Sequence, residues 1–312
     1  MSMKFRVGTR GSKLSRMQTE EFLRELQMAR PEAEFEVQII KTLGDTERIK
    51  PLFKIDSKGI FEKEIDQALV NGEVDFAISS LKDVPAAEGA ETVIAAVPKR
   101  ASVHDVLVSR DRVPLKALPK GAVVGTGSLR RLAMVKHVRP DLNVKPIRGN
   151  VDTRLQKVRR GEVDAVIVAE AGLERMCHIA QNAERLPLDQ FPSAPGQGAL
   201  AIVAKRGNTE VIRFLSAAEH PQTRAEVTAE RSLMLQLGGG CRVPVGAVGH
   251  VESNVLSLRG VLYTLDGENK VEATATSAIM NAEKLGKTVA EALVKQGAKE
   301  IEKEWREKYG PW

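Results

Sequence analysis

The sequence has little cysteine, little histidine and no long apolar run. Its 312 residues include two cysteines, which excludes the disulfide framework of a small secreted domain, and its five scattered histidines form no ligand spacing with them. No window approaches the roughly 18 unbroken apolar residues of a membrane helix, and MSMKFRVGTR leads into a strand pattern without a signal-peptide core. We therefore expect a cytoplasmic protein with no membrane partner and no structural metal.

Aromatic residues are also scarce. They make up 4% of the chain, no RNA-binding aromatic motif is present, and the basic residues are not gathered in one arm or stripe. No GxxxxGK[ST] nucleotide motif and no helix-turn-helix segment occurs. The formal charge is nevertheless +6, which indicates an anionic partner. Together these features favour a small polyanionic ligand over nucleic acid.

The first 200 residues contain the same plan twice. FRVGTRGSKLS at 5–15 is a strand that we expect to break at Gly8 and Thr9 into a helix, and AVVGTGSLRRLAMV at 122–135 repeats it. In each half a helix later ends at glycine and a strand follows, in NGEVDFAISS and RGEVDAVIVAE. This alternation of strand and helix predicts parallel sheets with helices on both faces.

The chain is too long for one ordinary core. The two halves are joined near 97–106 and again near 191–205, where ALAIVA is expected to return as a further strand of the first domain. Two crossings are typical of a hinge. We predict a first domain over residues 1–97 with 199–217, a second over 98–198 and a third over 218–312.

The third domain has a different pattern. A helix to Leu237 precedes three strands, VPVGAVGHV, VLSLRGVLYTLD and KVEATATSA, with DGEN as a turn between the last two. One amphipathic helix over about 281–307 is expected to end the chain. These elements predict a smaller α+β domain.

The first half carries an insertion relative to the second. Most of it falls in KTLGDTERIKPLFKIDSKG, residues 41–59, which is charged and punctuated by glycine. One interpretation is a mobile loop that covers a site, and the other is an exposed insertion without a task.

Anion sites are indicated where strands enter helices, because ligands of open parallel sheets bind at the carboxyl ends of strands. GTRGS and GTGSLRR lie at such turns, where glycine permits close approach and helix N-terminal amides are free to donate. Taken alone, each turn is more often a tight connection than a site. The case for binding rests on the arginines in or just after these turns, which can grip carboxylates: Arg10, Arg130, Arg131, Arg148 and Arg154.

SSLKDVP at 79–85 places Lys82 and Asp83 after a buried strand, at the same edge. An aspartate among cations keeps its charge at neutral pH, which suits it to stabilise a positive intermediate and to relay a proton. The alternative is a capping turn with an adjacent ion pair.

The two cysteines differ in their surroundings. Cys177 lies in LERMCHIA, a helical stretch, and is interpreted as a packing residue. Cys241 follows three glycines in LGGGCRVPVG, so its sulfur is presented rather than packed, and nearby Arg242 would favour the thiolate. Three interpretations remain open for Cys241: a catalytic thiol, an attachment point, or a site of incidental oxidation.

Eight stretches in this order resemble the porphobilinogen deaminase (hydroxymethylbilane synthase) family: VGTRGSKLS, KGIFEKEI, SLKDVP, GTGSLRR, IRGNVDTRL, AGLERM, APGQGALAI and GGGCRVPVG. Each is modest alone, but the series covers nearly the whole chain. The resemblance implies an α/β fold with two similar doubly wound domains, shaped like the lobes of a type II periplasmic binding protein, and a smaller α+β C-terminal domain.

The resemblance also implies an activity. A dipyrromethane cofactor is held by a thioether to Cys241, and four porphobilinogen molecules condense onto it with loss of ammonia before hydrolysis releases hydroxymethylbilane, a step of tetrapyrrole and heme biosynthesis. Asp83 matches the family's essential aspartate. The implied binding residues for cofactor and substrate carboxylates are Arg10, Ser12, Lys54, Lys58, Ser80, Lys82, Thr126, Ser128, Arg130, Arg131, Arg148, Arg154 and Arg175.

We expect such a transferase to be a monomer. The alternative is a two-lobed small-anion-binding protein without catalysis, which would leave GGGC unexplained.

The sequence departs from the family pattern at a few positions. Ser79 stands where histidine is usual, Asp152 where glycine is common, and Gly127 where serine is frequent, while IDSKG replaces GGKG. The missing imidazole puts in doubt any role assigned to it, but the aspartate, the arginines and the cysteine are all present.

Overall fold

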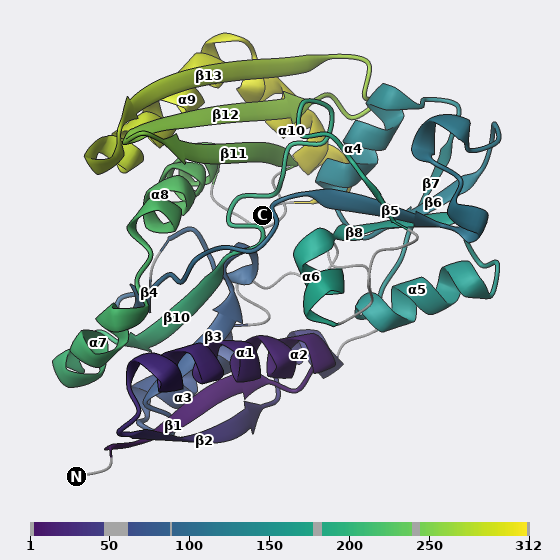
Figure 1. Cartoon of the computed structure of the whole chain (residues 1–312). Helices are drawn as coiled ribbons and strands as arrows, with labels where there is room; N and C mark the ends of the chain where they lie inside the picture. The colour runs from purple at the N-terminus through teal and green to yellow at the C-terminus, as the bar shows by residue number, and fades with distance from the viewer. Residues whose placement is uncertain (1–2, 47–61, 88, 177–182, 239–243, 311–312) are drawn as a thin grey trace.

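The computed structural model describes residues 3–46, 62–87, 89–176, 183–238 and 244–310, and three sheets form within these ranges (Figure 1). Two are five-stranded and mixed, and the third has three antiparallel strands. The expected fold class, two similar doubly wound domains with a smaller α+β domain, is confirmed.

The first sheet has the order β2-β1-β3-β10-β4. It consists of β1 (Met3–Arg10), β2 (Ala33–Ile40), β3 (Phe76–Ser80), β4 (Thr92–Ala96) and β10 (Leu200–Lys205). Strands β1, β2 and β3 are parallel, while β10 is antiparallel to both β3 and β4. The return of ALAIVA to the first sheet is therefore confirmed.

Helices cover both faces of this sheet because its strands are apolar on both sides. Phe76 and Ile78 pack with α1 (Lys13–Ala29) and α7 (Thr209–Leu215), whereas Ala77 between them packs with α3 (Lys63–Val70). A short helix, α2 (Leu43–Thr46), follows β2. The rest of the predicted loop lies outside the described residues.

The second sheet repeats the plan with the order β7-β6-β8-β5-β9. Its strands are β5 (Asp105–Ser109), β6 (Val123–Thr126), β7 (Asn143–Pro146), β8 (Ala165–Ala169) and β9 (Ala183–Arg185). Helix α4 (Leu129–Val138) packs on one face, and α5 (Val151–Arg159) and α6 (Glu170–Arg175) pack on the other. In each half, one strand next to a chain crossing is antiparallel to its neighbours: β10 in the first sheet and β5 in the second.

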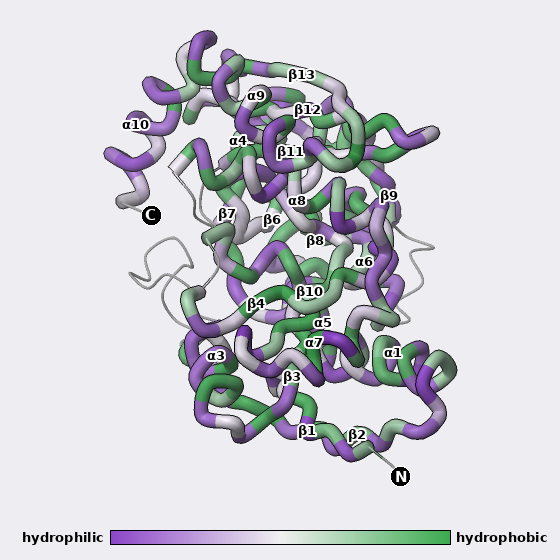
Figure 2. Tube along the Cα trace, turned by 90° about the vertical axis from the view of Figure 1, so that its left-hand side faces the viewer, coloured by the Kyte–Doolittle hydropathy of each residue, from purple (hydrophilic) through white to green (hydrophobic). Residues whose placement is uncertain are grey.

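The third sheet consists of β11 (Val245–Glu252), β12 (Val255–Tyr263) and β13 (Lys270–Ala278), packed against α8 (Pro221–Gln236) and α9 (Ala282–Lys295). Its core is continuous with that of the second sheet, since Met134 and Phe191 belong to the same buried cluster as Leu233 and Tyr263. Figure 2 shows the hydrophobic residues concentrated in the strands, with a hydrophilic α10 (Ala298–Tyr309) at the outside.

Two predicted boundaries were wrong. Strand β1 does not break at Gly8 but pairs with β2 as far as Arg10, because Gly8 leaves room for Ile40 against its backbone. The single final helix is two helices, since Gly297 takes a left-handed φ of 100° and ends α9. Helix α10 then turns back, and the buried indole of Trp305 donates to the Tyr263 carbonyl at 2.8 Å.

Glu230 of α8 ties both chain crossings to the third sheet. Its carboxylate, with no exposed surface, pairs with Arg100 of the first crossing at 2.9 Å and accepts from the Gly196 amide of the second at 2.7 Å. It also accepts from the Gly249 amide of β11 at 2.9 Å. A single buried charge therefore fixes the place where the three parts of the chain meet.

We expect Glu230→Ala to lower the free energy of unfolding by about 3–5 kcal/mol, because it leaves the Gly196 and Gly249 amides without their acceptor and the buried Arg100 guanidinium with only its longer ion pair to Glu226, at 3.5 Å. Denaturant unfolding measures the change, with Glu283→Ala of the exposed Lys287–Glu283 pair as a control that should leave the transition nearly unmoved. Equal transitions for the two variants would show that Glu230 has no such role.

Candidate active site

The carboxyl ends of the strands in the first two sheets face one another across the middle of the molecule (Figure 1). Helix α1 of the first half contacts α6 of the second, and Arg175 of α6 forms an ion pair with Glu21 of α1 at 2.9 Å. This is the arrangement that the repeated strand-to-helix turns predicted. The predicted binding residue Arg175 thus lies where the two halves meet.

Asp83 ends a short 3₁₀ turn, Leu81–Asp83, that follows β3 directly. One of its carboxylate oxygens lies 4.0 Å from Nη1 of Arg10, at the end of β1. One third of the Asp83 side chain is exposed, against 16% for Arg10. The carboxylate is therefore held beside a cation while remaining accessible to a ligand.

Asp105, at the start of β5, is fully buried between two arginines of α4. Its two carboxylate oxygens pair with Arg130 at 2.8 Å and with Arg131 at 2.7 Å, and Gln197 donates to it at 2.8 Å. Burial alone would raise the pKa of Asp105, but the two guanidinium charges outweigh burial and hold that pKa below its usual value.

Positive charge remains in excess around this cluster. Burial and, to a smaller extent, the charge of Arg131 together lower the pKa of Lys82 to about 8. Burial likewise lowers the pKa of Arg154 to about 10, with Arg131 and Arg148 adding to the effect. Cations that depress one another's pKa are relieved by an anion, so the cluster is suited to bind carboxylates.

Besides their ion pairs with Asp105, Arg130 and Arg131 donate hydrogen bonds to backbone carbonyls. Arg130 donates to the Pro192 carbonyl and Arg131 to the Ile167 carbonyl, the latter at 3.0 Å. Both Nε atoms are buried without a hydrogen-bond partner among the described residues. Arg154 donates its Nε to the Gly149 carbonyl at 2.9 Å, which leaves its terminal nitrogens for other contacts.

The predicted hydroxyl groups have local partners. Ser12 and Ser128 are the N-caps of α1 and α4, accepting from Ser15 and Arg131 amides. The Thr126 hydroxyl accepts from the Ser128 amide at 3.1 Å, and Ser80 exchanges hydrogen bonds with the side-chain amide of Gln18. These contacts shape the turns, so the sequence identified their position correctly.

Some predictions lie outside the described residues. They are the attachment residue Cys241 with its neighbour Arg242, the binding residues Lys54 and Lys58, and the packing residue Cys177.

Sequence reasoning missed three buried polar residues of this region. Asp105 and Gln197 organise the arginines, and Glu62 accepts a hydrogen bond from Ser79 at 2.9 Å behind β3. Gln197 lies in the motif APGQGALAI and Glu62 in the motif KGIFEKEI, which offered a signal, whereas Asp105 lies in none of the eight motifs.

The described residues contain no group of three or more His, Cys, Asp or Glu arranged to hold a metal ion. None of the helices in these ranges is long and apolar enough to cross a membrane.

Solved structures with a similar course of the chain include binding proteins. A putative methionine-binding lipoprotein from Bacillus subtilis covers 70% of this chain and 90% of its own, at 16% identity and a TM-score of 0.44. The aliphatic sulphonate binding protein SsuA from Escherichia coli covers 75% and 70%, at 14% identity and a TM-score of 0.40. With scores this low, the fold assignment rests on the two sheets themselves.

Family models and relatives are far more specific. Residues 5–213 match the model "Porphobilinogen deaminase, dipyromethane cofactor binding domain", and residues 224–295 match "Porphobilinogen deaminase, C-terminal domain". A probable porphobilinogen deaminase of Nitrosopumilus maritimus is 43% identical over 99% of both chains, and the porphobilinogen deaminase of Brevibacillus brevis is 44% identical over 96% of both. The chain therefore belongs to the porphobilinogen deaminase family.

Proposed function

We propose that this chain is a hydroxymethylbilane synthase, a transferase of tetrapyrrole biosynthesis. It condenses four porphobilinogen molecules, with loss of ammonia, onto a covalent dipyrromethane primer, and hydrolysis then releases hydroxymethylbilane. The observation that carries the proposal is the group of cations around Asp105, in which Arg130 and Arg131 are buried and Lys82 and Arg154 half-buried, set beside the accessible carboxylate of Asp83 in a chain of this family.

The residues fit an anionic primer. Each pyrrole of a dipyrromethane brings an acetate and a propionate. Burial and the charge of Arg131 lower the pKa values of Lys82 and Arg154, and a carboxylate beside these cations would offset the repulsion between them. Arg131 and Arg154 would hold these carboxylates. When bound, the primer supplies the pyrrole carbon onto which porphobilinogen is added.

Asp83 is proposed as the catalytic residue. Positive charge develops at pyrrole nitrogens during each addition, and a carboxylate fixed beside them stabilises it without having to reorganise. Arg10, at 4.0 Å, restrains that carboxylate. The same preorganisation would be lost if an amide replaced the charge.

The other predicted site residues are proposed as carboxylate donors for successive rings. In the first half of the chain they are Arg10, Ser12, Lys54, Lys58, Ser80 and Lys82. In the second half they are Thr126, Ser128, Arg130, Arg131, Arg148, Arg154 and Arg175. Arg130 would act mainly by holding Asp105, because the hydrogen bonds described for it go to the protein. A non-catalytic anion-binding protein is not favoured, since the relatives are named as enzymes.

The finer assignments belong to the same proposal. They are the domain limits 1–97 with 199–217, 98–198 and 218–312, the thioether at Cys241, a monomeric state and a cytoplasmic location.

We expect the denatured protein, purified from cells that make porphobilinogen, to carry the mass of two linked pyrrole units in addition to its polypeptide. Intact-mass spectrometry checks this. Cys241→Ser should remove the added mass because the sulfur is its only tether, while Cys177→Ser should retain it. A bare polypeptide mass in the unmodified protein would contradict the proposed enzyme.

We expect Asp83→Asn to lower kcat by about 100-fold or more, because an amide cannot stabilise developing positive charge as a carboxylate does. Steady-state assays of product formation measure the loss. Asp111→Asn, an exposed aspartate on the second half, should keep wild-type kcat. Should Asp83→Asn turn over like that control, another residue supplies the charge.

A further inference from the structure

Glu62 is a buried carboxyl for which the reaction described above has no role. It immediately precedes α3, and 3% of its surface is exposed. Ser79 of β3 donates to Oε2 at 2.9 Å, and Oε1 is buried without a hydrogen-bond partner among the described residues. A buried ionised carboxylate with one unsatisfied oxygen is costly, and a neutral acid in the same place costs less.

The charges around Glu62 agree with a neutral acid. Burial raises the pKa of Glu62 to about 8; the Ser79 hydrogen bond works against this, Asp83 adds to it, Arg10 opposes it and Asp66 adds to it. The Asp83 carboxylate and its Arg10 partner therefore lie near enough to act on Glu62. The raised pKa thus favours the neutral form of Glu62 at neutral pH.

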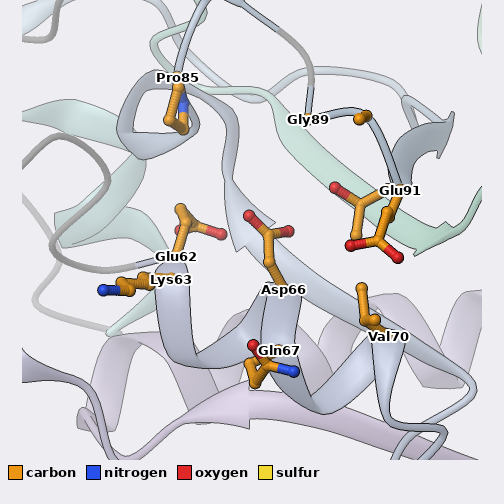
Figure 3. Close-up of a pocket in the computed structure, with 10 residues that line it drawn as sticks. Glu62, Lys63, Asp66, Gln67, Val70, Pro85, Gly89 and Glu91 are labelled. Atoms are coloured by element: carbon orange, nitrogen blue, oxygen red, sulfur yellow. The ribbon is translucent and has the colours of Figure 1, made fainter.

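Glu62 also faces solvent on its other side through a cavity of about 330 Å³ lined by Lys63, Asp66, Gln67 and Glu91. Figure 3 shows the side chains of Glu62, just before α3, and of Asp66 in α3 side by side, with Glu91 across from them. Lys63, Gln67 and Glu91 are exposed, so the cavity opens to the surface.

Charged groups face Glu62 from each element packed around it. They are Arg10 at the end of β1, Lys63 and Asp66 of α3, Asp83 after β3, Glu91 before β4, and Arg231 of α8. Arg231 is engaged by the carbonyls of Val84 and Pro85 at 3.0 and 2.7 Å.

We propose that Glu62 is a positioning residue for Asp83: its carboxyl stays neutral beside the Arg10–Asp83 pair and exchanges its proton with solvent through the acidic cavity, away from the substrate side. This rests on the proposed function of Asp83. Each addition breaks the C–N bond of the protonated aminomethyl group of porphobilinogen and a C–H bond at the acceptor carbon, and it forms one C–C bond between the two rings. The amine leaves as ammonia and takes up the proton released from the acceptor carbon, giving ammonium. The balance therefore needs no proton from Glu62, and its role is electrostatic.

The consequence is a dependence on pH. When Glu62 ionises, a second negative charge lies beside Asp83 and competes for Arg10. Glu62→Gln keeps the shape and hydrogen-bonding capacity of the neutral acid but cannot ionise. Lys82, whose pKa burial also lowers to about 8, titrates in both proteins, so the informative quantity is the ratio of variant to wild-type kcat.

For Glu62→Gln we expect the ratio of variant to wild-type kcat to rise about tenfold between pH 7 and pH 9. Over this range the fraction of wild-type protein with a neutral Glu62 falls about tenfold, whereas the glutamine cannot ionise. Ser79→Ala removes the hydrogen bond that stabilises the ionised form, so its ratio should also rise at alkaline pH. Glu91→Gln, an exposed residue of the same cavity, should give a flat ratio. A flat ratio for Glu62→Gln would overturn the proposal.

Unfolding measurements test the protonation of Glu62 without turnover. Above its ordinary pKa of 4.5 the unfolded chain loses this proton while the folded chain keeps it to about pH 8. Wild type should therefore lose stability relative to Glu62→Gln as pH rises from about 4.5 to about 8, with no further change above.

The two readouts separate the possible failures. Parallel stability curves for wild type and Glu62→Gln would overturn the proposal, because Glu62 would then be ionised in the fold. A protein without any turnover would refute the proposed function instead, while the stability curves would still decide whether Glu62 is neutral.

Discussion

The buried carboxylate of Asp105 between Arg130 and Arg131 is the interaction on which the site depends. One negative charge balances two guanidinium groups only in part, and the charge of Arg131 adds to burial in lowering the pKa values of Lys82 and Arg154. Such an arrangement is stable only because Asp105 is itself fully paired. The cations around Asp105 are therefore held in place to bind carboxylates that the protein itself does not supply.

Three buried carboxylates do different work because their surroundings differ. Asp105 is ionised by two arginines, Glu230 fixes the chain crossings through Arg100, and at Glu62 burial outweighs the charge of Arg10 and favours a neutral acid. Asp83, by contrast, is partly exposed and lies beside Arg10. The first two domains thus combine chain crossings fixed by the buried Glu230 with the accessible carboxylate of Asp83.

The sequence predicted the features that depend on residues close together in the chain. The turns GTRGS and GTGSLRR became helix caps at Ser12 and Ser128, and the apolar run ALAIVA returned as β10. Long-range pairings were not predictable, since Asp105 meets Arg130 only after 25 residues of intervening fold and Glu62 meets Ser79 across α3 and β3. The break at Gly297 was missed because the amphipathic pattern continues through it.

The central claim is that the cations around Asp105 receive the carboxylates of a pyrrole chain that lies over Asp83. A crystal structure of the protein purified from cells that make porphobilinogen tests it most directly. The account predicts density continuous with the Cys241 sulfur, with ring carboxylates in hydrogen-bond contact with Arg131 or Arg154 and ring nitrogens toward Asp83. A pyrrole chain attached elsewhere, or one whose carboxylates meet none of these cations, would contradict it.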